Sequence, residues 1–243
     1  MKLRIVAIGL CFFCFNACEK DGFSDPKPIS TSINKILPLG ASRVEGGRPA
    51  YESFRYELWK LLKEDQITFD FVGTQSDEAI YPSFNGDEFD IDHEGRGGWT
   101  SGEIRDGLED WLIEVGTADI VLLSSPGGND ALLNLSYREA VDNINAIIDI
   151  LQDNNSNVTI IIEQLAPARS EDMTAELTSF ITKIHQDVLN IAASKTTATS
   201  QVIPIDMFTG FEDRFLADDV HYNEEGAMFV ANRYYDVLLN VLE

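Results

Sequence analysis

The chain of 243 residues is long enough for one sizeable hydrophobic core and too short for two full domains. Its 18 basic and 41 acidic residues give a formal net charge of −23 at pH 7. This charge argues against nucleic acid as a partner, since nucleic-acid-binding proteins neutralise phosphates with a basic face. It also argues against direct docking on an anionic membrane surface.

The N-terminus has the pattern of an export signal. Lys2 and Arg4 precede an apolar run over residues 5–15, which is too short to span a bilayer. Ala17 and Cys18 follow, and together these features resemble a bacterial lipoprotein signal in which Cys18 is the lipidated residue. An ordinary secretory signal cleaved nearby is the alternative.

Three regions follow from this interpretation. We expect a signal peptide over 1–17, a polar, lipid-anchored tether over 18–32, and one globular domain over 33–243. The predicted location is that of an exported bacterial lipoprotein, in the periplasm or at the outer membrane or cell surface. The lipid anchor is then the only expected contact with a membrane.

Strand and helix patterns alternate along the predicted domain. The run 118–123 is almost entirely apolar, which is typical of a strand buried on both faces. Thr100 and Glu103 have the spacing of a helix-capping box. Alternation of this kind implies a parallel sheet covered by helices on both faces. We expect strands over 33–39, 67–72, 118–123, 158–165 and 201–207, and helices over 50–64, 100–115, 137–151, 173–193 and 224–242.

The segment 75–98 has no periodicity and is rich in acidic residues, glycine and aromatics. Loops of this length inside a compact domain are usually functional or disordered. The acidic positions between Asp87 and Glu94 do not match the spacing of an EF-hand loop. We therefore interpret the segment as a solvated acidic loop and predict no metal site.

Four chemically distinctive features stand at, or just after, predicted strand ends: Ser42, Gly98, Asn129, and the pair Asp218 and His221. Parallel strands bring residues that are distant in sequence to one edge of the sheet. A serine needs a base, and the base needs an orienting carboxylate. His221 and Asp218 supply both, with Asp219 as the competing carboxylate. An oxyanion needs hydrogen-bond donors. The candidates for the site are Ser42, Asp218 and His221 as catalytic residues, and Ser42, Gly98 and Asn129 as the oxyanion hole.

These features together resemble the SGNH, or GDSL-like, hydrolase family. Residues 39–42 stand where its nucleophile block would be, Gly98 and Asn129 match its oxyanion glycine and asparagine, and residues 218–221 match its Asp-x-x-His pair. The resemblance runs in the expected order from residue 33 to the C-terminus. Segments 71–74 and 92–100 look most like the acetylxylan-esterase-like branch.

The resemblance implies a flavodoxin-like, three-layer αβα fold with a five-stranded parallel sheet. It implies a serine esterase that removes O-acetyl groups from carbohydrate through an acetyl-enzyme intermediate, without a metal or organic cofactor. His93, Trp99 and Tyr222 are candidate substrate-binding residues, although His93 could instead orient the Gly98 turn. His185 lies on an apolar helix face and is interpreted as structural.

One position departs from the family pattern, and two other functions stay open. Ala41 stands where the family usually has Asp; that residue is not a triad member, but its loss is expected to loosen the turn that aims Ser42.

The rival enzyme is a lipase or thioesterase on the same scaffold. The rival from another class is a glycan-binding surface lipoprotein with little turnover. Oligomeric state is not predicted.

Overall fold

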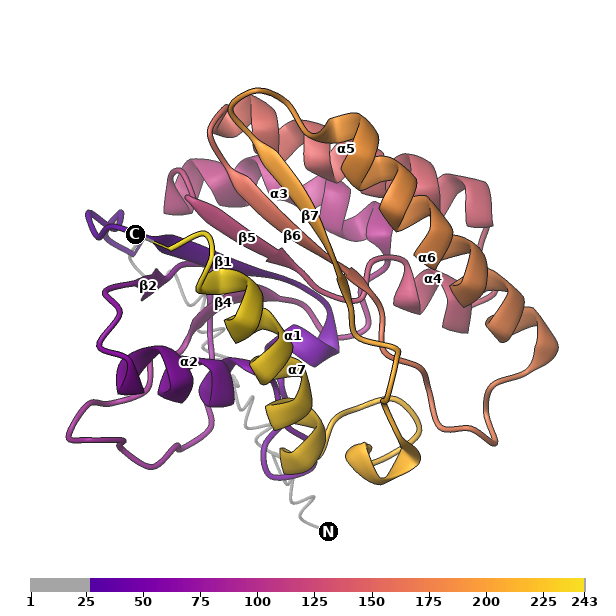
Figure 1. Cartoon of the computed structure of the whole chain (residues 1–243), viewed down its shortest axis with the longest axis horizontal. Helices are drawn as coiled ribbons and strands as arrows, with labels where there is room; N and C mark the ends of the chain where they lie inside the picture. Colours follow the sequence, from indigo (N-terminus) through magenta and orange to yellow (C-terminus); the bar gives the residue numbers. More distant parts are fainter. Residues whose placement is uncertain (1–26, 243) are drawn as a thin grey trace, which may run out of the picture.

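A seven-stranded sheet forms the middle layer of the structure (Figure 1). The computed structural model describes residues 27–242, so the predicted signal peptide and Cys18 lie outside the described residues. The strands are β1 (Lys35–Gly40), β2 (Asp70–Phe71), β3 (Gln75–Ser76), β4 (Asp92–Gly95), β5 (Ile120–Leu123), β6 (Thr159–Gln164) and β7 (Gln201–Asp206).

Helices cover both faces of this sheet. In Figure 1, α3, α5 and α6 lie on one side of the strands, and α2 and α7 lie on the other. The helices are α1 (Ser42–Glu45), α2 (Arg55–Glu64), α3 (Ser101–Val115), α4 (Gly128–Leu132), α5 (Tyr137–Asn154), α6 (Ala175–Lys195) and α7 (Glu224–Leu238), with a 3₁₀ turn at Asp213–Phe215.

The five predicted strands pair in parallel, in the spatial order β2-β1-β5-β6-β7. This order and the helices on both faces confirm the predicted flavodoxin-like, three-layer fold. Two short strands were not predicted. β4 pairs in parallel with the end of β1, and β3 pairs antiparallel with β4. Their residues are polar, so no apolar alternation marked them as strands.

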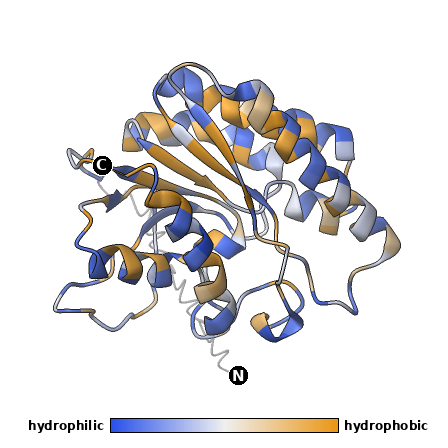
Figure 2. Cartoon of the chain, in the orientation of Figure 1, coloured by the Kyte–Doolittle hydropathy of each residue, from blue (hydrophilic) through white to orange (hydrophobic). Residues whose placement is uncertain are grey.

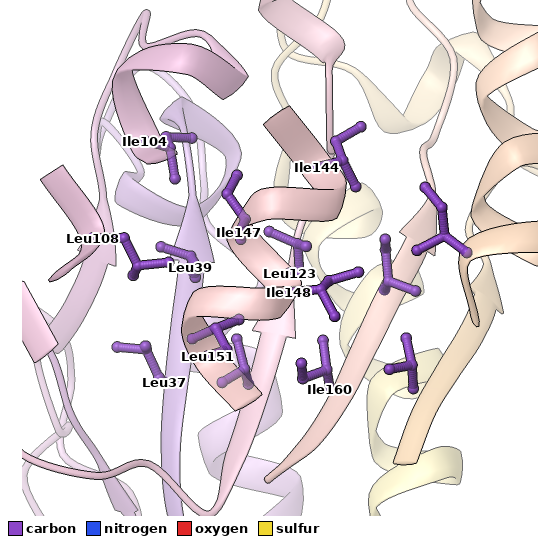
Figure 3. Close-up of a cluster of buried hydrophobic side chains, with 14 of the residues drawn as sticks. Leu37, Leu39, Ile104, Leu108, Leu123, Ile144, Ile147, Ile148, Leu151 and Ile160 are labelled. Carbon is purple, nitrogen blue, oxygen red and sulfur yellow. The ribbon is translucent and has the colours of Figure 1, made fainter. Parts of the chain in front are cut away.

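The two faces of each central strand belong to different cores. On β1, Leu37 and Leu39 pack with α3 and α5, whereas Ile36 packs with α2 and α7. Figure 2 shows the apolar colouring concentrated on the strands and on the helix faces turned toward them. Figure 3 shows the core on the side of α3 and α5, in which Ile104 and Leu108 of α3 and Ile144, Ile147, Ile148 and Leu151 of α5 surround Leu37, Leu39, Leu123 and Ile160.

The predicted helix over 50–64 starts too early. α2 begins at Arg55, and the residues before it form a turn in which Gly47 pairs with Tyr51 and Glu52 pairs with Tyr222. These backbone contacts, of which the second is with a distant loop, replace the helical hydrogen bonds that the apolar spacing predicted. The short helices α1 and α4 were also not predicted.

The end of the predicted tether lies against the domain. Lys27 Nζ donates to the carbonyls of Gly73 (3.0 Å) and Gln75 (2.8 Å) and pairs with Asp92 Oδ1 (2.7 Å). Three oxygens therefore hold this ammonium at the sheet edge. Across the described range, none of the helices has both the length and the apolar character needed to cross a membrane.

Candidate active site

The turn that carries Ser42 lies at the carboxyl edge of the sheet. β1 ends at Gly40, where a Cβ atom would lie 2.8 Å from Val44 Cγ2 and 2.9 Å from the Ser124 carbonyl oxygen. Only glycine fits this approach without a shift of its neighbours. Ser42 then opens α1, so the strand end and the helix start fix its backbone.

Ala41 caps α1 through its backbone. Its carbonyl oxygen accepts hydrogen bonds from the amides of Val44 and Glu45, both at 3.0 Å. Its methyl side chain makes no capping hydrogen bond. Backbone hydrogen bonds therefore hold the turn in shape. They counteract part of the loosening that we expected from an alanine at position 41.

Ser42, His221 and Asp218 form a continuous hydrogen-bonded chain. Ser42 Oγ lies 2.9 Å from His221 Nε2, and His221 Nδ1 lies 2.7 Å from Asp218 Oδ2. These are ordinary hydrogen-bond lengths, across a separation of 179 residues in sequence. The arrangement has the geometry of a nucleophile, a base and an orienting carboxylate.

Asp218 is held as a carboxylate. Partial burial alone would raise its pKa, but hydrogen bonds from the amides of His221 and Val220 and from the imidazole outweigh this and lower the pKa to about 2. The competing carboxylate, Asp219, points elsewhere: it is exposed and lies 3.9 Å from Arg169. The structure thus assigns the contact with His221 to Asp218.

The two other predicted oxyanion donors come from the first turn of α4, which carries Asn129, and from the loop before α3, which carries Gly98. Asn129 Nδ2 donates one hydrogen to the Trp99 carbonyl at 2.7 Å, and this nitrogen carries a second hydrogen. Gly98 precedes Trp99 and has φ +79°, a conformation that favours glycine. The Arg96 amide bonds the carbonyl of Gly40 at 3.0 Å, which ties the Gly98 loop to the end of β1.

A cavity of about 60 Å³ lies beside the Ser42 hydroxyl. Ser42, Trp99 and Asn129 are among the residues that line it, together with backbone at Gly127 and Gly128. The rest of the lining is mainly aliphatic and includes Ile104, Leu123, Ile144, Ile147, Leu165 and Ile181. A small apolar group attached to the reacting carbonyl would find an apolar environment here.

Two of the three predicted substrate-binding residues are buried away from any substrate. Tyr222 is 0% exposed and packs beneath Arg43. His93 is 2% exposed, and its Nδ1 accepts a hydrogen bond from the Gly95 amide at 3.0 Å. Burial, and next the charge of Arg55, lowers the pKa of His93 to about 2, so the ring is neutral. Neither ring is open to a substrate, and the contact of His93 with Gly95 fits its alternative role of orienting the Gly98 turn; Trp99 lines the cavity.

Arg43 was not singled out in the sequence. This side chain is 8% exposed, and its guanidinium donates to the carbonyls of Val220 (2.9 Å), Ala166 (2.8 Å) and Pro167 (3.0 Å). It thereby joins the Ser42 turn to the loop that carries His221 and to the loop after β6. Nothing local in the sequence indicates this role, since the acceptors are backbone atoms of distant segments.

A buried carboxylate lies behind this arginine. Glu163 accepts hydrogen bonds from the Ser125 amide and the Tyr234 hydroxyl, both at 2.7 Å. Burial raises the pKa of Glu163 above its usual value. Arg43 Nη1 lies 3.4 Å from Ser125 Oγ, so one shared serine links the two buried charged side chains.

Tyr51 is the second residue that the sequence analysis missed. Its ring stacks on the His221 imidazole with 3.9 Å between ring centroids and 17° between planes. Apolar spacing had placed Tyr51 on a helix, whereas the glycines at 46 and 47 and the proline at 49 are the local signals of a turn.

Metal ligands are not gathered in the described part of the chain. Over residues 27–242 no group of three or more His, Cys, Asp or Glu side chains has an arrangement that could hold an ion. His185 is the remaining histidine, and its Nε2 lies 3.1 Å from the Leu165 carbonyl oxygen.

Comparison with known families gives one match. The model of the GDSL-like Lipase/Acylhydrolase family matches residues 67–228, which is more than half of the chain. The matched range includes Gly98, Asn129, Asp218 and His221 and begins after Ser42. No curated protein sequence matches the chain.

Several solved structures share the fold over most of their length. A family 3 carbohydrate esterase of Clostridium thermocellum is 28% identical, with a TM-score of 0.68 over 86% of this chain and 98% of that one. A carbohydrate esterase family 3 structure from Talaromyces cellulolyticus is 25% identical, with a TM-score of 0.72 over 85% and 97%. An acetyl esterase mutant crystallised with an acetate ion has a TM-score of 0.74 at 24% identity, over 85% and 97%.

Proposed function

The chain belongs to the GDSL-like lipase/acylhydrolase family of ester hydrolases, and on this premise we propose that it removes O-acetyl groups from carbohydrate through an acetyl-enzyme intermediate. The observation that carries the proposal is the 2.9 Å contact between Ser42 Oγ and His221 Nε2 at the mouth of the cavity. Without this contact the hydroxyl would have no base within reach.

The reaction proceeds in two halves. Ser42 Oγ attacks the ester carbonyl while His221 Nε2 takes its proton; the tetrahedral oxyanion is met by the amides of Ser42 and Gly98 and by the Asn129 side chain. His221 returns the proton to the departing sugar oxygen, which leaves the acetyl group on Ser42. Water then attacks this ester with His221 as base, and acetate leaves.

Asp218 stays ionised throughout. Its hydrogen bond to His221 Nδ1 fixes the tautomer that leaves Nε2 able to accept the serine proton. Its charge also stabilises the imidazolium that forms in each half-reaction. The low pKa of Asp218, about 2, fits this role because the carboxylate does not compete for the proton.

The cavity beside Ser42 accommodates acetyl as the acyl group. Its volume of about 60 Å³ exceeds the ~10–15 Å³ that one water molecule needs on the same measure, and its aliphatic lining suits a methyl group. The two family 3 carbohydrate esterases support a sugar hydroxyl as the leaving group. The half-buried Trp99 in the cavity lining is the candidate aromatic contact for the sugar ring.

The aliphatic lining favours one second candidate, a lipase or thioesterase that takes longer acyl chains. Comparing p-nitrophenyl acetate with the octanoate separates the two functions. A higher kcat/KM for the acetate supports the acetyl esterase, and a higher value for the octanoate supports the rival.

The role of Ser42 is tested directly with Ser42→Ala. We expect kcat for p-nitrophenyl acetate to fall by a factor of the order of 10⁴–10⁶, because the nucleophile is removed. Ser156→Ala is the matched control, since Ser156 is an exposed turn residue before β6, at the opposite edge of the sheet. Acetate release from a panel of acetylated polysaccharides then identifies the substrate; binding of acetylated xylan with no acetate release would instead favour the glycan-binding protein.

The export signal and the lipid on Cys18 belong to the same proposal and are supported by the pattern of the first 18 residues. With Cys18→Ser we expect the protein to move from the membrane fraction to the soluble fraction of the producing cells. An unchanged membrane fraction would remove the lipid anchor from the proposal.

A further inference from the structure

The imidazole of His221 is constrained on its edges and on one face. Asp218 Oδ2 and Ser42 Oγ hold its two ring nitrogens, and the Tyr51 ring covers a face at 3.9 Å with the planes 17° apart. Hydrogen bonds at the two nitrogens fix the ring in its own plane but leave it free to tilt about the line between them. A stacked ring opposes that tilt.

The backbone pins Tyr51 to the loop that carries His221. Glu52 follows Tyr51 in the chain, and Tyr222 follows His221. The amide of Glu52 donates to the carbonyl oxygen of Tyr222 at 2.8 Å. On its other side, the Gly47 amide donates to the Tyr51 carbonyl at 3.3 Å. Tyr51 therefore sits in a closed turn that is itself bonded to the catalytic loop.

Gly47 makes room for the tyrosine ring. A Cβ atom at this position would lie 2.5 Å from Cε1 and Cζ of Tyr51 and 2.9 Å from its hydroxyl oxygen. Contacts below 3.0 Å do not occur for real Cβ atoms, so any side chain at Gly47 would displace the ring. The position of the Tyr51 ring thus depends on Gly47, whose backbone hydrogen bonds are to Tyr51 and Ala50.

The hydroxyl of Tyr51 stays protonated. Burial, followed by the charges of Glu45 and Asp218, raises the pKa of Tyr51 above its usual value. The group that faces the imidazole is therefore a neutral aromatic ring, and replacing Tyr51 with Phe removes no charge.

From this geometry we propose that Tyr51 is a positioning residue for His221: its ring holds the imidazole in the plane that joins Asp218 to Ser42 and presents a π-face to the imidazolium formed during acyl transfer. Stacked aromatic pairs are stabilising beyond the area they bury, and a cation over an aromatic face is attracted by the ring quadrupole. The benefit is greatest in the transition state, where the imidazole becomes charged. The inference rests on the proposed serine-esterase function.

The test compares Tyr51→Phe with Tyr51→Leu, using p-nitrophenyl acetate as the probe and measuring kcat, KM and the thermal midpoint of each variant. Phe keeps the stacked ring, whereas Leu fills similar space without one. We expect Phe to keep kcat within about twofold and Leu to lower it roughly three- to tenfold, with KM little changed. Equal kcat values for Phe and Leu would overturn the proposal, and so would a loss confined to KM.

Gly47→Ala supplies a second arm that leaves Tyr51 in place. The added Cβ displaces the ring, so we expect a loss of kcat like that of Tyr51→Leu. If the ring carries the effect, the double variant Gly47→Ala/Tyr51→Leu loses no more kcat than Tyr51→Leu alone. Fully additive losses would show that Gly47 acts by another route and would count against the proposal.

Wild type and Ser42→Ala in the same assay separate this inference from the proposed function. Turnover that requires Ser42 but is indifferent to the ring at position 51 overturns the inference alone. Wild-type turnover that survives Ser42→Ala removes the proposed function, and the inference falls with it.

Discussion

At the scale of single residues, the contact between Asp218 and His221 decides which tautomer of the imidazole is present. Asp218 Oδ2 accepts from Nδ1 at 2.7 Å, while Oδ1 accepts from the amides of Val220 (2.9 Å) and His221 (2.7 Å). One carboxylate therefore shapes the loop and orients the base. Replacing the carboxylate of Asp218 with an amide separates these two roles.

Asp218→Asn is predicted to lower kcat by about 10⁴-fold with little change of fold. The Asn oxygen can still accept from the two amides, but its NH₂ group faces Nδ1 and favours the wrong tautomer. Steady-state hydrolysis of p-nitrophenyl acetate measures the loss. The matched control is Asp219→Asn, because Asp219 is exposed and only distantly paired with Arg169. A comparable loss in both variants would contradict the assignment.

At the scale of structural elements, Arg43 connects three segments that approach one another only in the fold. Its guanidinium bonds carbonyl oxygens before α7 and after β6, while its backbone belongs to α1. A planar fork of five N–H donors can serve several carbonyls at once, which a single ammonium cannot do with the same geometry. The loops around Ser42 thus share one anchor.

We predict that Arg43→Lys lowers the free energy of unfolding by about 2–4 kcal/mol, since it leaves buried carbonyl groups without donors. Urea denaturation measures this change. Arg138→Lys serves as the control because the Arg138 side chain is 90% exposed, and its effect should stay within about 0.5 kcal/mol. An Arg43→Lys variant as stable as wild type would show that the three bonds contribute little.

At the scale of the whole molecule, stability depends on where the protein buries its many acidic groups. Asp90 precedes β4 and accepts hydrogen bonds from the amides of Phe71 (2.7 Å) and Asp92 (3.3 Å). Burial raises its pKa to about 6 despite these bonds, which by themselves would lower it. The folded protein therefore binds a proton at Asp90 more tightly than the unfolded chain does.

The sign of the pH dependence follows from this shift. The contribution of Asp90 to stability is fully present below its unfolded pKa of 3.8 and is lost as the pH rises through about 6. Between pH 4 and pH 7 we predict that wild type loses about 2 kcal/mol relative to Asp90→Asn, as measured by urea unfolding at each pH. Asp110→Asn, at an exposed position on α3, is the matched control. A constant difference between wild type and Asp90→Asn would refute the prediction.

Elements whose signals are local could be predicted from the amino-acid sequence. Apolar spacing and alternation predicted the five parallel strands and most helices, and the capping box at Thr100 and Glu103 is present as expected. The spacing of Asp218 and His221 also placed base and carboxylate on one loop, because three residues suffice to bring them together.

The remaining features of the fold and the site depend on contacts between segments that are distant in the chain. β4 lacks an apolar pattern and is a strand because β1 offers it an edge; Tyr51 leaves its predicted helix because Tyr222 pairs with Glu52. The contacts of Arg43 and the burial of His93 likewise depend on segments far away in the chain. Local patterns reflect preferences of neighbouring residues, whereas these contacts exist only after the sheet has brought remote loops to a common edge.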